Sequence, residues 1–378
     1  MADVEICPST GRELGISFRL AGRTIGKYRI ERLIAEGGMG VVLEAVHEAI
    51  GRKVALKFLH PRFLLDREMR KRFSREAKAA AGIGHENIIN IIDIDQEDES
   101  GATYIVMEYL EGQNLGWWIE KKGQLPVKWT VDITLQVLSA LNACHCLGII
   151  HRDMKPENIF ITRRANRTDL VKLLDFGTAK IKAAGTASIL TGEGTVLGTP
   201  HYMSPELLEG GDKFDFRTDL YSCGVLLYQC LTGKLPFDAR RLIGIYHAIM
   251  NDTPESPQFV RPDLPDGLVE VVMKSFARNR DERYAGAADM AAALEPFGSG
   301  MFALKEEMAK GEELARTARS RLGPISDSAE TAAEPVFEPP AGADVPDRPP
   351  GVRGKIVALI AAGLVLLGLG LAAVYFLL

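Results

Sequence analysis

The stretch His151–Asn158, with the sequence His-Arg-Asp-Met-Lys-Pro-Glu-Asn, constrains this chain of 378 residues more than any other part. It follows an amphipathic run and the strand-like Gly148-Ile149-Ile150. Asp153 can orient and deprotonate an attacking hydroxyl, Lys155 can neutralise charge on a moving phosphoryl group, and Asn158 can hold a magnesium ion. These side chains suit phosphoryl transfer, although a polar loop with a chance Asp and Asn is the alternative interpretation.

Two further stretches carry residues that could take part in phosphoryl transfer. Asp175-Phe176-Gly177 begins 17 residues after Asn158, and its carboxylate can be a second metal ligand. Near the other end of the chain, the alternating runs Tyr28–Ile34 and Val41–His47 flank a glycine-rich turn. These runs predict a β-hairpin whose backbone can approach phosphates closely, because glycine has no Cβ atom. A turn of this kind is weak evidence alone, since most such turns bind nothing.

Lys57 lies within Lys53–Leu59, whose apolar residues predict a buried strand. A lysine in a buried strand needs a carboxylate partner, because an unpaired buried charge is costly. A charged helix predicted from about residue 66 to residue 81 supplies Glu76 as the candidate, with Glu68 and Glu86 as competitors.

In this order, the motifs resemble those of the eukaryotic-type protein kinases. The resemblance covers residues 28–297 and implies an α+β, two-lobed kinase-like fold, with a small β-rich N-lobe and a larger helical C-lobe. The pattern agrees with that order, since its period changes from 2 to about 3.6 after the hinge-like run Thr103–Gly112. Helices are expected at Thr130–Leu147 and from Asp219 onwards, and the nucleotide is expected between the two lobes.

The resemblance also implies the roles of individual residues. Lys57, held by Glu76, would position the phosphates of ATP, and Asn158 with Asp175 would bind Mg²⁺, with Mn²⁺ as an alternative ion. Asp153 would be the base, and Lys155 would steady the transferring group. The glycine-rich loop departs from the family pattern at Ala35, which is expected to weaken or reposition nucleotide binding. The expected nucleotide contacts are Ile34, Ala35, Glu36, Gly37, Gly38, Met39, Gly40, Val41, Val42, Lys57, Met107, Glu108, Leu110 and Asp175, with the backbones of Glu108 and Leu110 bonding the base.

The segment 178–206 resembles the regulatory loop of the same family. It is rich in Gly, Ala, Thr and Ser and ends in Gly-Thr-Pro-His-Tyr-Met-Ser-Pro-Glu. Thr191 and Thr195 are the expected phosphorylation sites, and a phosphate there could order the loop against Arg152 and Lys180. Solvation of the loop by these hydroxyls is the alternative. The resemblance further implies that Thr199 bonds Asp153, that Glu206 pairs with Arg283, and that Asp219 braces the catalytic loop.

Composition narrows the functional class. The formal net charge of −5, without an extended basic patch with interleaved aromatics, argues against a nucleic-acid binder. Five irregularly spaced cysteines suit a reducing compartment. Cys144-His145-Cys146 could suggest a metal cluster, but Cys144 continues an apolar helical stripe, so core packing is the favoured interpretation.

The remaining segments predict a membrane anchor. Residues 1–27 form an extension, and 298–322 suit a charged, exposed helix. Residues 323–354 form a Pro-rich linker that we expect to be disordered. Residues 355–378 predict a transmembrane helix, because 356–378 hold 23 residues without a charge and would span about 35 Å. A buried core helix is the alternative. Basic residues just before this segment place the N-terminal side in the cytoplasm, at a bacterial inner membrane.

The sequence therefore predicts a serine/threonine kinase similar to the bacterial membrane-anchored kind. Its expected partners are proteins that carry Ser or Thr, a second copy of itself for autophosphorylation in trans or as a dimer, and the membrane; nucleic acid is not among them. Lys155, two residues after Asp153, and Gly198-Thr199 resemble the serine/threonine branch. The alternatives are a catalytically weak kinase-fold scaffold, a small-molecule phosphotransferase, and a membrane adaptor that binds through the Pro-rich linker.

Overall fold

The computed structural model describes residues 22–37, 40–60, 63, 66–97, 102–164, 168–175, 200–210, 214–302 and 304–322, without the side chains of residues 72, 76, 305 and 319–322. All of these residues belong to one compact unit that spans Met1–Ile325. The predictions for residues 1–21, for the loop that contains Lys180, Thr191, Thr195 and Thr199, for the linker and for the transmembrane segment lie outside the described residues.

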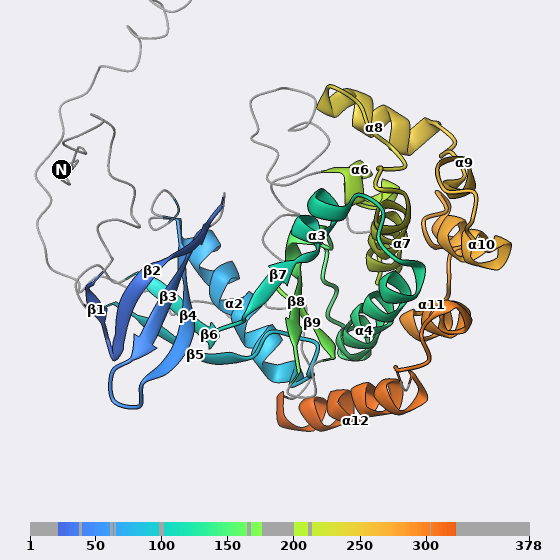
Figure 1. Ribbon diagram of the computed structural model, residues 1–378. Coiled ribbons are helices and arrows are strands. Elements are labelled where there is room, and N and C mark those ends of the chain that lie inside the picture. Colours follow the sequence, from blue (N-terminus) through green and yellow to red (C-terminus); the bar gives the residue numbers. More distant parts are fainter. Residues whose placement is uncertain are drawn as a thin grey trace, which may run out of the picture. The chain divides into compact units, whose positions relative to one another are not determined.

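The first half of this unit is an antiparallel sheet in the order β1-β2-β3-β4-β6-β5 (Figure 1). Alternating apolar residues on β2, β3 and β4 bury one face, which includes Ile30, Leu43 and Leu56. This alternation follows from the two-residue period of a strand. The strands are β1 (Thr24–Ile25), β2 (Tyr28–Glu36), β3 (Gly40–His47), β4 (Arg52–Leu59), β5 (Ile91–Gln96) and β6 (Thr103–Glu108).

Helix α2 (Arg67–Ile83) packs against this sheet. Asp66 caps its start by accepting hydrogen bonds from the amides of Glu68 and Met69, and Gly84 ends it with φ 66°. Phe73 and Ala77 bury the inner face against β4 and β6. The helix thus occupies the position predicted from the sequence, two residues longer at its C-terminal end.

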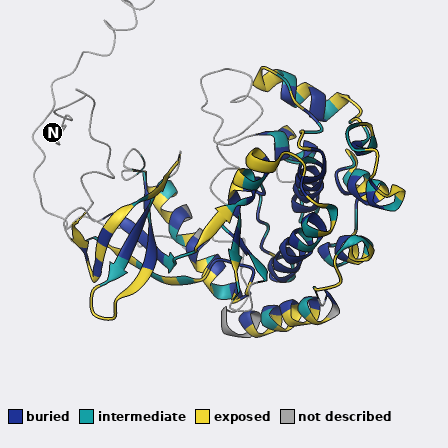
Figure 2. Ribbon diagram, viewed as in Figure 1, coloured by how far each residue is buried: buried dark blue, intermediate teal, exposed yellow. Residues whose placement is uncertain are grey.

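The second half is mainly helical, as predicted. Helices α4 and α7 are buried on nearly all sides, because other helices and strands of the unit pack around them (Figure 2). The helical elements are α3 (Leu115–Lys122), α4 (Val127–Cys146), η2 (Pro156–Asn158), η3 (Pro200–Tyr202), α6 (Pro205–Glu209), α7 (Arg217–Thr232), α8 (Leu242–Asn251), α9 (Pro257–Val260), α10 (Asp266–Ser275), η4 (Arg280–Glu282), α11 (Ala287–Leu294), η5 (Glu295–Phe297) and α12 (Leu304–Leu322).

A small sheet positions the predicted catalytic residues. Its strands β7 (Gly112–Asn114), β8 (Ile159–Arg163) and β9 (Asp169–Leu173) are antiparallel and lie in that order. The stretch His151–Asn158 enters β8, and Asp175 follows β9. Because β8 and β9 are neighbours with Ile159 opposite Leu173, the two segments lie close together.

Helix α12 corrects the prediction of an exposed helix. The structure buries one of its faces against α4, with further contacts to α2. Leu304, Met308, Gly311, Ala315 and Ala318 are buried on this face, and a Cβ atom on Gly311 would lie at ordinary contact distance from Ala143, 3.5 Å. These positions recur every three or four residues, the period of one helix face. The many charges obscured this stripe in the sequence.

Among the helices that the structure describes, none is both long and apolar enough to cross a bilayer. The transmembrane helix predicted at residues 355–378 lies outside the described residues.

His85 links the region after α2 to α4. It is 5% exposed, its Nδ1 accepts a hydrogen bond from the Asn87 amide at 3.1 Å, and its Nε2 lies 3.2 Å from the Ser139 hydroxyl. Burial lowers the pKa of His85 to about 4, and the positive charge of Lys172 acts in the same direction against the opposing effect of Glu307. The imidazole is therefore neutral in the folded protein over most of the pH range.

We expect His85 to make stability fall with falling pH. Between pH 6.5 and about 4 the unfolded chain binds a proton at His85 that the folded chain does not, so the free energy of unfolding declines by up to about 3 kcal/mol. His85→Asn keeps an acceptor for the Asn87 amide and removes the titrating ring. Urea unfolding at pH 7 and pH 4.5 should show a smaller pH-dependent loss in this variant than in the parent. The same loss in both would contradict the assignment, and His247→Asn, at an exposed histidine, is the control.

Candidate active site

The carboxylate of Asp219 holds the start of the loop His151–Asn158 in place. It lies in the first turn of α7, is fully buried, and accepts hydrogen bonds from the amides of His151 at 2.9 Å and Arg152 at 2.8 Å. His145 Nε2 lies 2.9 Å from Oδ2 of Asp219, the oxygen that also accepts from the His151 amide. Burial acts to raise the pKa of Asp219, but its hydrogen bonds and the nearby histidines outweigh burial and lower the pKa. Arg152 has φ 65°, a strained value for a non-glycine residue that these bonds stabilise.

His151 connects the catalytic loop to the segment that carries Asp175. Its Nε2 donates to the Leu174 carbonyl at 2.8 Å, and its Nδ1 accepts from the Asp153 amide at 3.3 Å. These two bonds require the neutral imidazole with the proton on Nε2. Burial lowers the pKa of His151, which favours the same form. His151 thus fixes the backbone on both sides of the site.

Asp153, the predicted base, lies between two cooperating side chains. Lys155 Nζ is 3.1 Å from its Oδ2, and Asn158 Nδ2 donates to the same oxygen at 2.9 Å and to the Asp153 carbonyl at 2.7 Å. The structure therefore brings these three residues together. Because the amide nitrogen of Asn158 is used in these bonds, its oxygen is the atom that can coordinate a metal, and oxygen is the ligand that Mg²⁺ prefers.

Lys57 pairs with Asp175 across the two halves of the unit. Lys57 Nζ lies 2.5 Å from Asp175 Oδ1, and the Asp175 side chain remains 49% exposed. Partial desolvation of this carboxylate acts to raise the pKa of Asp175, but the charge and hydrogen bond of Lys57 outweigh it and lower the pKa. The carboxylate is thus ionised at neutral pH, as a metal ligand must be. Glu76, the predicted partner of Lys57, lies in α2, but its side chain is outside the described part of the chain.

The glycine-rich segment joins β2 to β3. Gly37 donates to the Gly40 carbonyl at 2.9 Å, while Gly38 and Met39 lie outside the described residues. Val42 is opposite Lys57 in the sheet register, so the predicted phosphate loop and the predicted phosphate lysine are neighbours. Val41 is buried, whereas the end of β2 is exposed from Ile34 to Gly37 and includes Ala35 and Glu36.

The hinge-like residues Met107, Glu108 and Leu110 are all partly buried. The Glu108 amide donates to the Asn90 carbonyl at 3.0 Å, so a contact from its backbone to a nucleotide base would use the carbonyl. Its carboxylate accepts from the Asn90 amide at 2.8 Å and pairs with Lys172 at 2.7 Å. The sequence analysis missed this pair, although a lysine between Val171 and Leu173 on a buried strand signals that a partner is needed.

Glu206 and Arg283 form the pair implied by the sequence resemblance. The guanidinium donates two hydrogen bonds to the carboxylate, at 2.7 and 2.9 Å, and it also lies 4.9 Å from the centre of the Tyr221 ring. Arg283 is 4% exposed. Burial acts to raise the pKa of Glu206, but Arg283 outweighs it and lowers the pKa. The pair ties the segment after the regulatory loop to the helical core.

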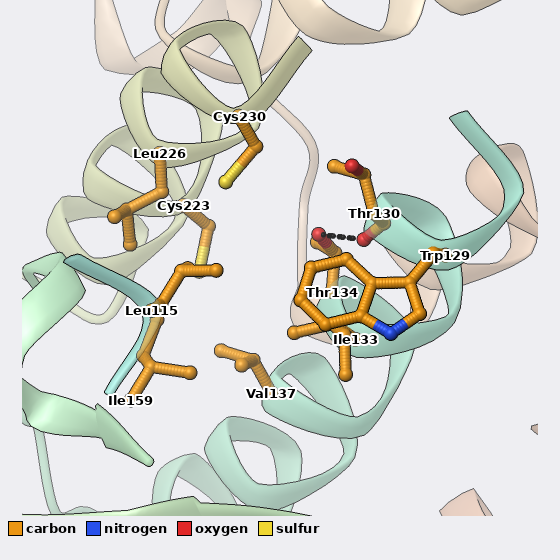
Figure 3. A pocket seen from close by; sticks show the side chains of 10 residues that line it. All are labelled: Leu115, Trp129, Thr130, Ile133, Thr134, Val137, Ile159, Cys223, Leu226 and Cys230. Atoms are coloured by element: carbon orange, nitrogen blue, oxygen red, sulfur yellow. Dashed lines mark hydrogen bonds between the residues drawn. The ribbon is translucent and has the colours of Figure 1, made fainter. Parts of the chain in front are cut away.

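A separate cavity between α4 and α7 does not belong to this site (Figure 3). Trp129 of α4 closes one side, and the sulfur atoms of Cys223 and Cys230 of α7 face it. The space holds about one water molecule and none of the predicted catalytic residues lines it. Burial raises the pKa of both cysteine thiols, so they are packing groups and not nucleophiles.

Comparison with known proteins agrees with this geometry. Residues 28–293 match the family model of the protein kinase domain. The chain is 42% identical over 278 residues to the serine/threonine-protein kinase pkn3 of Myxococcus xanthus, a match that covers 72% of this chain and 50% of that protein. It is 34% identical over 328 residues to the serine/threonine-protein kinase PrkC of Bacillus subtilis, covering 82% of this chain and 49% of that protein.

Among solved structures, the crystal structure of the PknI kinase domain of Mycobacterium tuberculosis superposes with a TM-score of 0.57 at 27% sequence identity. The match covers 73% of this chain and 98% of that domain. The chain spans about half the length of the curated relatives it matches.

The two glycines of the loop should respond differently to substitution. A Cβ atom on Gly40 would collide with the Phe58 carbonyl, whereas one on Gly37 would meet no atom within 4 Å. Gly40→Ala should therefore lower the free energy of unfolding by about 1–3 kcal/mol, because β3 and β4 must separate. Gly37→Ala should change it by less than about 0.5 kcal/mol.

Urea unfolding of both variants and the parent measures this difference. Equal stability of the two variants would contradict the packing argument, and ATP titration of the folded Gly37→Ala protein reports on nucleotide binding separately.

Proposed function

The chain belongs to the protein kinase family, and on this premise we propose that it transfers the γ-phosphate of ATP to serine and threonine hydroxyls of proteins. One observation carries the proposal: Asp153 is held between Lys155 and Asn158, beside the Lys57–Asp175 pair. An acid, two cations and two metal-ligand candidates thus meet at one place. Phosphoryl transfer depends mainly on such positioning and charge neutralisation.

The positions of Asp153, Lys155, Asn158 and Asp175 suggest a separate role for each residue. Bonds from Lys155 and Asn158 orient the Asp153 carboxylate, which accepts the proton of the attacking hydroxyl. Lys155 places its positive charge next to that carboxylate and therefore next to the transferring group. Mg²⁺, when bound, supplies charge neutralisation on the phosphates, and Asn158 and Asp175 would hold it.

Lys57 contributes the second positive charge. Its side chain is 14% exposed and its ammonium is directed at Asp175, so phosphates near Asp175 would share this charge. Glu76, on α2, would hold Lys57 from the other side. The nucleotide would lie between the glycine-rich segment and the hinge, with the Glu108 carbonyl and the Leu110 backbone at the base.

Two features support serine and threonine as acceptors. Lys155 follows Asp153 by two residues, and Gly198-Thr199 precedes the Pro-Glu segment. The similar proteins of Myxococcus xanthus and Bacillus subtilis are named serine/threonine-protein kinases.

Regulation and location are part of the proposal. Phosphorylation of Thr191 or Thr195 would add negative charge that Arg152 and Lys180 can bind. Residues 355–378 would anchor the protein as a single transmembrane helix, with the kinase domain in the cytoplasm, and two tethered copies would phosphorylate each other in trans. The alternative is a catalytically weak scaffold of the same fold at the membrane.

Incubation of the full chain in detergent with labelled ATP and Mg²⁺ tests the activity. The parent should label itself and a generic protein substrate. Asp153→Asn removes the base and Lys57→Met removes the phosphate cation, and each should reduce labelling at least about 100-fold. Asp263→Asn, at an exposed acid, is the control and should retain full activity.

Mass spectrometry of the labelled parent should find phosphate on Thr191 or Thr195. Equal labelling of the parent and the Asp153→Asn variant would contradict the role of Asp153. Binding of ATP by the parent without any labelling, before or after treatment with an upstream kinase, would favour the scaffold.

Tethering should accelerate phosphorylation in trans. The comparison uses the full chain in vesicles and a truncated chain that ends at Ile325, because α12 packs on α4 and must be kept. At equal low protein concentration the vesicle-bound chain should autophosphorylate faster, since two-dimensional confinement raises the local concentration. Equal initial rates in the two samples would refute the tethering proposal.

A further inference from the structure

The outer face of α2 forms a strongly basic groove with the neighbouring end of the β5–β6 hairpin. The groove has a volume of about 430 Å³ and is open to solvent. Arg67, Arg70, Lys71, Ser74, Arg75, Lys78, Gln96 and Thr103 line it. All five basic side chains are exposed, and the polar Gln96 and Thr103 come from the two strands.

These five cations have no ion-pair partner among the described residues. The acids of this segment are Asp66, which caps the first turn, Glu68, and Glu76, whose side chain lies outside the described part of the chain. Elsewhere in the described chain some exposed cations are paired, as Lys27 is with Asp93 and Lys310 with Glu307. Others, such as Lys121 and Lys122, form no ion pair with the described residues and lie outside this groove. The chain as a whole carries a formal net charge of −5, so this face has the opposite sign to the average surface.

The spacing of these cations lowers the stability of helix α2. Arg67 and Lys71, and Lys71 and Arg75, are like charges four residues apart, while Arg67 and Arg70, and Arg75 and Lys78, are three apart. Like charges at these spacings are neighbours on a helix and destabilise it by about 0.2–0.5 kcal/mol per pair. The fold does not need them, because Phe73 and Ala77 hold the helix through its other face. An anionic ligand would remove this repulsion.

We propose that this groove binds a phosphorylated peptide segment of a protein. Three of the five cations are arginines, whose planar guanidinium groups bond two phosphate oxygens at once. Gln96 and Thr103 add hydrogen-bonding groups from the strands, which suit a peptide backbone. None of the large exposed hydrophobic residues lines the groove, so it lacks the apolar contacts with which a surface enters a membrane.

Helix α2 brings the groove close to the proposed active site. The buried side of α2 packs on Leu59 and Ile105, and Ile105 is opposite Lys57 in the sheet. A peptide held there would increase the local concentration of an already phosphorylated protein near the active site. That consequence depends on the proposed kinase function, whereas binding itself does not.

Fluorescence anisotropy without ATP tests the binding. The probe is a labelled ten-residue peptide with two phosphoserines among alanine and glycine, and the full chain in neutral detergent is the titrant. The parent should bind in about 0.1 M salt, and the same peptide without phosphates should not. In Arg70→Glu/Arg75→Glu the affinity should fall at least about tenfold, because two charge-assisted contacts become repulsive.

The control Lys121→Glu/Lys122→Glu makes the same charge change at exposed positions of α3 and should bind within about twofold of the parent. Loss of folding does not explain weaker binding in the α2 variant if its thermal midpoint is unchanged or higher. A midpoint at or above that of the parent is expected, since the substitutions turn repulsive helix neighbours into attractive ones.

Equal affinity of the parent and the α2 variant, or equal losses in both variants, would overturn the proposal. So would the absence of phosphopeptide binding, including the case in which vesicles with anionic lipid bind through Arg70 and Arg75 instead. Because no step requires catalysis, binding by the inactive Asp153→Asn chain would uphold the groove even if the proposed kinase activity failed.

Discussion

A buried carboxylate, that of Asp219, is the interaction on which the active site depends. An ionised group without water must be bonded on several sides, and here two loop amides and His145 supply the bonds. The need of the carboxylate for donors therefore fixes the backbone at His151 and Arg152. The strained φ of Arg152 persists because these bonds compensate for it. Helix α7 can present this carboxylate rigidly, since almost every other face of the helix is packed.

Hydrogen bonds and ion pairs connect the loop held by Asp219 to segments that are distant in the sequence. His151 reaches the Leu174 carbonyl, the next residue is Asp175, and Asp175 pairs with Lys57 on β4. A second link joins Glu108 at the end of β6 to Lys172 on β9. The Lys57–Asp175 and Glu108–Lys172 pairs each connect the β-rich part with the helical part of the same unit. A shift of one part would therefore move Asp175, the candidate metal ligand, relative to Lys57, the candidate phosphate-binding residue.

Charge serves two different purposes on the two long polar helices. On α12 the charges occupy the face opposite the apolar stripe, and the helix is held by packing on α4 and α2. On α2 the cations crowd one another without acidic partners in the described chain. The first arrangement keeps a packed helix soluble, and the second stores repulsion that an anion can relieve. Net charge alone does not distinguish the two, because the distinction depends on which face each charge occupies.

The sequence by itself determined the order of strands and helices, the chemistry of Asp153, Lys155, Asn158 and Asp175, and their assignment to one family. These features depend on residue type, spacing and local period, which a linear pattern records. Only the tertiary structure decided that Lys57 pairs with Asp175, that Lys172 holds Glu108, and that Gly40 is packed while Gly37 is not. It also decided that one face of α12 is buried and that the α2 cations line a groove. The physical reason is that partner choice and burial depend on segments far apart in the chain, which meet only after folding.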